Sequence, residues 1–218
     1  MDPFHEHLAR VGLAAAGRYG LALAGGYAMQ AHGLLERASE DVDLFMAWHQ
    51  RSEFGAAVDA VVAAYMADEL TVRAETRWDT FARLHVSDGV ETTKVELSAD
   101  WRANDPTWMT IGPVLHPDDA VVNKMCALFG RGEVRDFVDV DAALRSGRYS
   151  REGLVALAAA ADRGFDRSMF ADILGSVSRL ADGAFAAYGV SGRELDEMRE
   201  RFAQWRRELV STGDRPVG

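Results

Sequence analysis

The alternation of apolar and polar residues predicts two regions of different structure along the chain. Up to about residue 115, short apolar runs and alternating segments are interleaved with segments of helical spacing. From Pro117 onward, the apolar residues recur every three or four positions, which is the spacing of amphipathic helices. The pattern therefore predicts an α/β core over residues 1–115 and an all-helical domain over residues 116–218.

In the first region, the pattern predicts a mixed sheet with covering helices. A leading amphipathic helix is expected over Phe4–Gly17, and a helix over Ser52–Leu70 is expected to cover one face of the sheet. Strands are expected at Leu21–Ala24 and Asp41–Met46, with a helix-permissive segment, Tyr27–Leu35, between them. Further alternating segments with turn signals between them predict antiparallel strands at Val72–Trp78, Phe81–Val86 and Thr93–Leu97.

The second region is predicted to be helical throughout. Its expected helices are Pro117–Phe129, Glu133–Leu144, Arg151–Ala161, Arg167–Leu180 and Ser191–Leu209. The preceding segment contains Asn104-Asp105-Pro106 and Gly112-Pro113, which are turn signals typical of a border between domains. The tail, Ser211–Gly218, is expected to be loose.

Composition limits the class of protein. A chain of 218 residues with 48% hydrophobic and 27% charged residues is ordinary for a soluble globular protein. No apolar run approaches the roughly 18 residues of a membrane span, and the N-terminus does not resemble a secretory signal. We therefore expect a cytoplasmic protein without a membrane segment. The single cysteine excludes an internal disulfide, and His5 and His7 are expected to face solvent.

Charge is unevenly distributed and argues against a protein that coats nucleic acid by bulk attraction. The net charge is −10, of which residues 1–115 carry −8 and residues 116–218 carry −2. A polyanionic partner is therefore expected to bind the second region. Twenty-two arginines stand beside only two lysines, Lys94 and Lys124. A lysine kept in such a chain indicates a position that needs a compact ammonium and not a planar guanidinium.

The stretch from Leu21 to Met46 contains the candidate chemistry. Gly25-Gly26 ends an apolar run, and Asp41-Val42-Asp43 opens the next strand fifteen residues later. Residues two apart on a strand share a face and lie roughly 7 Å apart, which suits carboxylates that bind one or two Mg²⁺ ions. Alone, a glycine pair indicates only a tight turn, and Asp-x-Asp only an exposed strand end. Together, in a strand–helix–strand setting, they favour a metal–nucleotide site.

A third carboxylate is expected on a neighbouring strand. Glu96 lies in the alternating segment Thr93–Leu97 and points to the same side as Lys94. We expect Glu96 to be the third metal ligand, with Asp100 as the alternative. A solvent-facing Lys-x-Glu pair on an antiparallel strand is the competing interpretation.

The second region contributes its own candidates. Lys124 lies on or beside the apolar stripe of its helix, where a lysine that only extends from the edge toward solvent is common. Asp136 and Asp139 lie near the start of the next helix, where acids compensate the helix dipole. For Asp139, that explanation and a functional one remain equally open.

Two segments of the chain are similar to a known family. LAGGYAMQAHGLLERASEDVDLF and AVVNKMCALFGRGEVRDFVDV resemble polymerase-β-type nucleotidyltransferases and, within them, the AbiEii/AbiGii-type toxins, which include the MenT toxins of mycobacteria. The resemblance covers about residues 20 to 145. It implies a polymerase-β-type nucleotidyltransferase core with a mixed sheet, followed by the helical domain.

The resemblance also implies a function. It indicates a toxin of a toxin–antitoxin pair that transfers a nucleoside monophosphate from a nucleoside triphosphate, such as ATP or CTP, to an acceptor hydroxyl. The acceptor expected for this family is a tRNA 3′ end, whose modification blocks translation, and the expected partner is a cognate antitoxin. An aminoglycoside-type enzyme that modifies a small molecule, and a non-catalytic nucleotide-binding module, are the alternatives.

The same resemblance implies roles for individual residues. Asp41, Asp43 and Glu96 are expected to bind Mg²⁺ in a two-metal arrangement, with Glu96 as a further ligand or a base. Lys124 is expected to bind phosphate, and Asp136 to orient Lys124 or Arg131. The nucleotide-binding set implied by the resemblance is Gly25, Gly26, Arg37, Ser39, Lys124 and Arg131, with Arg83 as a further phosphate contact.

Overall fold

The computed structural model of the protein describes residues 1–213. The chain divides into two compact units, Met1–Ala120 and Val121–Gly218. The tail predicted to be loose, Ser211–Gly218, lies largely outside the described residues, and its first residues belong to the last helix.

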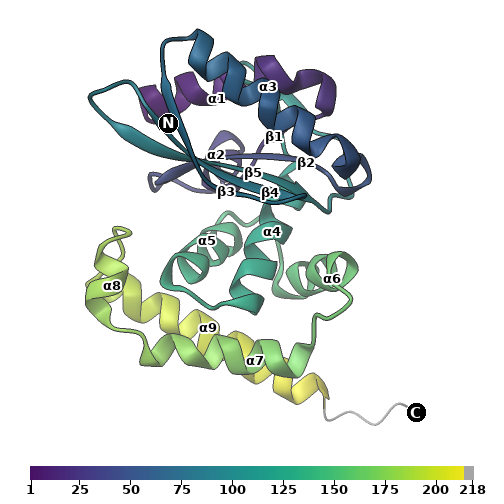
Figure 1. Ribbon diagram of the computed structural model, residues 1–218. Helices are drawn as coiled ribbons and strands as arrows, with labels where there is room; N and C mark the ends of the chain where they lie inside the picture. Colours follow the sequence, from purple (N-terminus) through teal and green to yellow (C-terminus); the bar gives the residue numbers. More distant parts are fainter. Residues whose placement is uncertain (214–218) are drawn as a thin grey trace. The chain divides into compact units, whose positions relative to one another are not determined.

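The first unit is built on a seven-stranded mixed sheet (Figure 1). The strand order is β3-β4-β5-β2-β1-β7-β6. Strand β2 pairs in parallel with β5, and β1 pairs in parallel with β7, whereas the other neighbours are antiparallel. This agrees with the predicted α/β class. The strands are β1 (Ala22–Leu23), β2 (Asp41–Ala47), β3 (Thr71–Arg77), β4 (Phe81–Ser87), β5 (Thr92–Asp100), β6 (Thr107–Met109) and β7 (Gly112–Val114).

The central strands present one apolar face and one polar face. Along β2 and β5, every second residue is buried, and Val42, Leu44 and Leu97 are fully inaccessible to solvent. Helices α1 (Pro3–Ala16) and α3 (Phe54–Ala67) lie side by side over the apolar face (Figure 1). The Tyr65 hydroxyl of α3 donates to the Leu8 carbonyl of α1 at 2.9 Å, and its burial raises the pKa of Tyr65. The period of two in the sequence thus leaves the polar residues of β2 and β5 on the opposite face.

A hairpin occupies the segment that the sequence indicates as a domain border. Strands β6 and β7 form it, and β7 joins the sheet through the Leu23–Val114 register. The Leu115 amide donates to the Leu23 carbonyl at 2.9 Å. The helix expected from Pro117 is present, but the sequence did not indicate the two strands before it. Strands of three residues are too short for alternation to reveal them, and β1, which joins the hairpin to the sheet, is far away in sequence.

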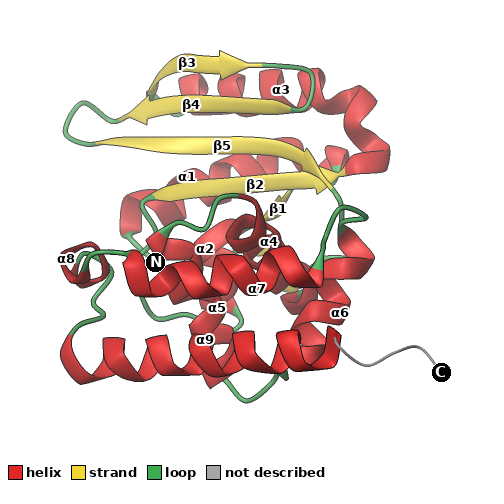
Figure 2. Cartoon of the chain, turned by 90° about the horizontal axis from the view of Figure 1, so that it is seen from below, coloured by secondary structure: helices red, strands yellow, loops and turns green. Residues whose placement is uncertain are grey.

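The second unit is helical, as the periodicity predicts. Helices α7 and α9 run side by side, which both views show (Figures 1 and 2). Phe137 packs edge-on against Phe202 at 5.2 Å between ring centroids, and Phe170 packs against Trp205 at 5.3 Å. No helix in the described part of the chain combines the length and apolar character needed to cross a bilayer. The helices are α4 (Pro117–Gly130, which begins in the first unit), α5 (Val134–Arg145), α6 (Arg151–Ala161), α7 (Arg167–Ser176), α8 (Asp182–Ala186) and α9 (Gly192–Gly213).

Candidate functional site

Three carboxylates share the polar face of the first unit's sheet. Asp41 and Asp43 lie two residues apart at the start of β2, and Glu96 of β5 is the register partner of Asp43. Neighbouring strands are about 4.8 Å apart, so register partners on one face are in reach of a common ligand. Asp100, the alternative third carboxylate, is paired with Ala47 at the far end of β2. The strand register thus groups Glu96, and not Asp100, with the two aspartates.

The glycine pair lies directly against the side chains of Asp43 and Ser39. Gly25 opens helix α2 (Gly25–Ala31) with a φ of +58°, and a Cβ placed on it would lie 1.7 Å from Oδ2 of Asp43. A Cβ on Gly26 would lie 2.7 Å from Oγ of Ser39. The Ala24 amide donates to the Asp43 carbonyl at 2.8 Å. Only glycine therefore allows the backbone at the start of α2 to approach the Asp43 carboxylate this closely.

Ser39 is held in a chain of buried polar groups that ends at Asp41. Its hydroxyl donates to Oδ1 of Asp41 at 3.3 Å, and its carbonyl accepts from the Tyr27 hydroxyl at 3.3 Å. Burial is the largest cause of a raised pKa for Tyr27. The Tyr27 hydroxyl also bonds Nδ1 of His5 at 2.6 Å, and Nε2 of His5 bonds the Thr93 hydroxyl at 2.9 Å.

His5 was expected to face solvent, and this is wrong, because it is 8% exposed. Its position three residues before the buried Leu8, on the apolar side of α1, is the signal that could have indicated burial. His7, in contrast, is about half exposed and bonds Asp68, in agreement with its expected place at the surface.

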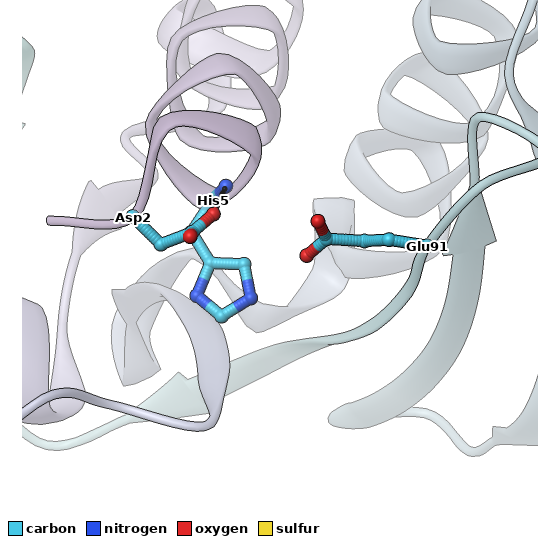
Figure 3. Close-up of side chains that lie close together, drawn as sticks. All are labelled: Asp2, His5 and Glu91. Atoms are coloured by element: carbon cyan, nitrogen blue, oxygen red, sulfur yellow. Dashed lines mark hydrogen bonds between the residues drawn. The ribbon is translucent and has the colours of Figure 1, made fainter.

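Within residues 1–213, the one group of three acidic or histidine side chains that lie close enough together to share a metal ion is Asp2, His5 and Glu91 (Figure 3). One ligand atom from each residue lies within 4.8 Å of the others. Oδ1 of Asp2, however, caps α1 by accepting from the amides of Phe4 and His5. Both His5 ring nitrogens are hydrogen-bonded as well. A cation here would have to compete with these bonds, so the group has a structural role of its own.

Glu96 is paired with an arginine of β4. Nε of Arg83 donates to Oε1 of Glu96 at 2.7 Å, and Nη1 of Arg83 reaches Oε1 of Glu75 at 3.3 Å. Hydrogen bonding to Glu96 raises the pKa of Arg83. Glu75 bonds His85 as well, and this bond is the largest cause of a lowered pKa for Glu75. Arg83, which the family resemblance suggested as a phosphate contact, thus orients the third carboxylate.

Arg37 lies in the loop that leads from α2 into β2. Its guanidinium donates to the Ala38 carbonyl at 2.9 Å, and its own carbonyl accepts from the Gln30 side chain. These bonds fix the loop just before Ser39 and Asp41. The structure therefore brings together one set of predicted site residues in the first unit: Gly25, Gly26, Ser39, Asp41, Asp43 and Glu96.

The remaining predicted residues lie in the second unit and form two ion pairs. Asp136 is fully buried and binds Nε and Nη2 of Arg131 at 2.9 and 2.7 Å. It also accepts from the Glu133 amide at 3.1 Å, as part of a capping box at the start of α5. Lys124 binds a different acid, Asp139, with 2.9 Å between Nζ and Oδ2. Of the two partners considered for Asp136, the structure gives it Arg131.

Asp139 is the residue whose role the sequence left open. It lies beyond the first turn of α5 and is fully buried, so its buried ion pair with Lys124 explains it better than compensation of the helix dipole. The spacing of three between Asp136 and Asp139 puts both on one side of the helix. That spacing, together with a lysine on a neighbouring apolar stripe, was the available signal.

The carboxylate set of the first unit fits a hard divalent cation. All of its side-chain donors are oxygens, which Mg²⁺ prefers. Oε1 of Glu96 and Oδ1 of Asp41 have protein partners, whereas no hydrogen bond to Oε2 of Glu96 or Oδ2 of Asp41 occurs within residues 1–213. One oxygen of each of these two carboxylates is therefore oriented by the protein, and the other is available to a ligand.

Comparison with known proteins finds a family model and solved structures to which the chain is similar. The family model of the nucleotidyl transferase AbiEii toxin of type IV toxin–antitoxin systems matches residues 8–215. Among curated proteins, no sequence is similar enough to count as a match.

Two solved structures show the same fold. One is JHP933 from Helicobacter pylori, with 17% identity, a TM-score of 0.60, and coverage of 96% of this chain and 94% of that one. The other is MenT4, a nucleotidyltransferase toxin from Mycobacterium tuberculosis H37Rv, with 15% identity, a TM-score of 0.60, and coverage of 95% of this chain and 90% of that one.

Proposed function

Because the chain belongs to the AbiEii family of nucleotidyl transferase toxins, we propose that it transfers a nucleoside monophosphate from a nucleoside triphosphate to a hydroxyl at a tRNA 3′ end. The family implies a nucleoside triphosphate as substrate and a cognate antitoxin as partner. The observation that carries the proposal is the grouping of Asp41, Asp43 and Glu96 on one face of β2 and β5. The proposed consequence in the cytoplasm is a tRNA that no longer supports translation.

Asp41, Asp43 and Glu96 are the residues that would hold Mg²⁺. When bound, Mg²⁺ supplies charge neutralisation for the phosphate oxygens and activation of the attacking hydroxyl. The support for this choice is the all-oxygen donor set and the absence of room for a Cβ at Gly25, beside Asp43.

The chain's own residues have distinct tasks in the proposed site. Ser39 fixes Oδ1 of Asp41, and Arg83 fixes Oε1 of Glu96, so both carboxylates are oriented before substrate binds. Gly25 and Gly26 let the backbone approach the triphosphate. Glu96 serves as the further metal ligand or accepts the proton of the acceptor hydroxyl. Lys124, Asp136 and Arg131 keep, as predictions, the phosphate-binding and supporting roles that the family resemblance implies.

The distribution of charge bears on which acceptor the protein uses. The second unit is nearly neutral, whereas the first carries most of the net negative charge, so a polyanion meets less repulsion at the second. The acidity of residues 1–115 favours the alternative, a cationic small molecule of the aminoglycoside type. The two alternatives differ in the molecule that becomes labelled.

The test is transfer of label from each of the four α-labelled nucleoside triphosphates, with Mg²⁺ and either total tRNA or an aminoglycoside. We expect labelled tRNA from the wild-type protein and none from Asp41→Ala. Asp59→Ala is the matched control, because it removes an exposed carboxylate that pairs with Arg77 away from the carboxylate set. Label on the aminoglycoside alone would support the small-molecule alternative.

Toxicity in cells separates the enzyme from a non-catalytic binding module. If toxicity results from catalysis, we expect Asp41→Ala to abolish toxicity and Asp59→Ala to retain it. If Asp41→Ala remained as toxic as the wild type at equal protein level, the binding module would explain the toxicity and catalysis would not.

A further inference from the structure

Lys94 is one of only two lysines in an arginine-rich chain, and it lies within the seven-stranded sheet. It belongs to β5, where its register partners are Asp41 of β2 and His85 of β4. Residues paired across strands, and residues two apart along a strand, share a face. Lys94 therefore projects from the same face as Asp41, Asp43 and Glu96, and it is partly buried there.

Lys94 makes no ion pair or side-chain hydrogen bond to any residue between 1 and 213. This is unexpected for an ammonium whose strand neighbour is Asp41 and which lies two residues from Glu96. The neighbouring basic side chains on β4 already have partners within the protein, because Arg83 binds Glu96 and His85 binds Glu75. Partial burial of a charge without a partner costs free energy of folding. The position of Lys94 therefore indicates that a bound ligand supplies the anion.

The anion that fits is a phosphate. A nucleoside triphosphate brings about four negative charges to a face that already carries three carboxylates, and a divalent cation offsets only part of this charge. Lysine binds phosphate as a compact point charge with three rotatable donors, which a planar guanidinium does not reproduce. This chemistry accounts for a lysine at residue 94 in a chain that otherwise uses arginine.

We propose that Lys94 binds a phosphate group of a substrate beside Asp41. The proposal rests on the proposed function and deepens it. Two sources offer the same chemistry, namely the triphosphate of the nucleotide and the backbone phosphate next to the 3′ end of a polynucleotide acceptor. A binding measurement without acceptor distinguishes them.

The experiment compares Lys94→Met with Arg73→Met. Arg73 is the register partner of His85 on β3, so it lies on the same sheet face, two strands farther from Asp41 than Lys94. Like Lys94, it makes no ion pair within the described residues. Both changes remove one positive charge from this face, and only one removes it beside Asp41. Lys94→Arg is the second variant, because it keeps the charge and protects the test against a misfolded Lys94→Met.

Calorimetric binding of the four nucleoside triphosphates with Mg²⁺, without acceptor, is the first readout. If Lys94 binds the triphosphate, Lys94→Met weakens this affinity about 10- to 100-fold, the usual loss for a charge-assisted hydrogen bond. If Lys94 binds the acceptor, this affinity is unchanged and the KM for tRNA rises by a similar factor. Lys94→Arg is expected to restore part of either loss, and Arg73→Met to stay within about twofold of wild type.

The proposed role of Lys94 is overturned if Lys94→Met and Arg73→Met have the same nucleotide affinity and the same KM for tRNA. If the wild type is active in that case, the proposed function still stands. Should Lys94→Met fail to fold, as judged by its circular dichroism and melting curve, wild-type affinity and KM in Lys94→Arg would overturn the need for a point charge. A wild-type protein that binds no nucleoside triphosphate and labels no acceptor would overturn both proposals.

Discussion

Single residues decide whether the carboxylate set can form. At Gly25, the backbone adopts a positive φ, and the space where a Cβ would stand is taken by the Asp43 carboxylate. The glycine is therefore required for two reasons, its conformation and its lack of a side chain. Gly33 shares the first reason and not the second, because it has a φ of +67° and a Cβ added there would meet nothing within 4 Å.

This contrast gives a matched pair of variants. Gly33→Ala is expected to cost about 1 kcal/mol of stability from backbone strain alone and to keep nucleotide affinity. Gly25→Ala must in addition displace the Asp43 carboxylate, so we expect label transfer to fall at least about 100-fold, by analogy with the loss of a positioned catalytic group. Thermal melting of both variants measures the loss of stability, and label transfer measures the loss of activity. Equal activity in the two would show that contact with Asp43 is unimportant.

The buried pair of Lys124 and Asp139 is a second residue-scale feature. Removing one member of a buried ion pair leaves the other without compensation, so Lys124→Met alone is expected to cost about 3–5 kcal/mol. Lys124→Met combined with Asp139→Leu is expected to cost much less than the sum of the two single changes. Urea unfolding of the wild type, both single variants and the double variant measures the coupling. Additive costs would contradict a direct pair.

Asp100 has a pH dependence that follows from its burial. Burial, only partly offset by a hydrogen bond from the Trp101 amide, raises the pKa of Asp100 above its ordinary value. Its charged form is therefore disfavoured in the folded state, and its contribution to stability is lost as pH rises through the raised folded pKa. Asp100→Asn keeps an acceptor for the Trp101 amide and removes the charge. We expect it to melt at a higher temperature than wild type at pH 7, with the difference vanishing below about pH 4.

At the scale of elements, the parallel register of β2 and β5 assembles the proposed site. It sets Asp43 beside Glu96 and Asp41 beside Lys94, while the antiparallel register of β4 brings Arg83 to Glu96. A shift of one residue would turn these side chains to the apolar face, where α1 and α3 pack, so burial of that face protects the register. The stability of the sheet and the geometry of the site thus have a common cause.

The start of α5 is the corresponding feature of the second unit. Asp136 accepts from the Glu133 amide and binds Arg131, whereas Ser150 at the start of α6 only accepts from the Gly153 amide at 3.0 Å. Ser150→Ala is therefore expected to cost about 1 kcal/mol, the usual value for a helix cap. Asp136→Ala loses a cap and an ion pair, so its cost should be clearly larger in urea unfolding. A cost no larger than that of Ser150→Ala would favour a role for Asp136 outside stability.

At the scale of the whole molecule, the charge distribution limits how an RNA acceptor is held. A net charge of −10 leaves no excess of positive charge for a broad phosphate-binding surface, so recognition of a tRNA end should rely on few phosphate contacts. Raising the salt concentration from 50 to 200 mM is therefore expected to change the tRNA KM by less than about tenfold. A change of a thousandfold or more would indicate many phosphate contacts and contradict this expectation.

The division of labour between residues 1–115 as a nucleotidyltransferase core and residues 116–218 as a helical domain remains our proposal. The two compact units, Met1–Ala120 and Val121–Gly218, provide its structural setting. Asp41, Asp43 and Glu96 belong to the first unit, and Lys124 and Asp136 to the second.

The sequence by itself determined the features that depend on neighbours along the chain. Alternation revealed β2 and β5 with their polar faces, helical spacing revealed α4 to α7 and α9, and the glycine pair with Asp41 and Asp43 indicated the candidate chemistry. These signals are local, because a strand or helix imposes its period on the residues within it.

Only the tertiary structure decided which charged groups meet. The choice of Glu96 over Asp100, the binding of Arg83 to Glu96, the pairing of Lys124 with Asp139 and the burial of His5 all depend on residues brought together from distant parts of the chain. The β6–β7 hairpin likewise depends on β1, about ninety residues earlier. Sequence patterns report which face a side chain occupies, whereas its partner is set by the register and packing of elements that the pattern does not connect.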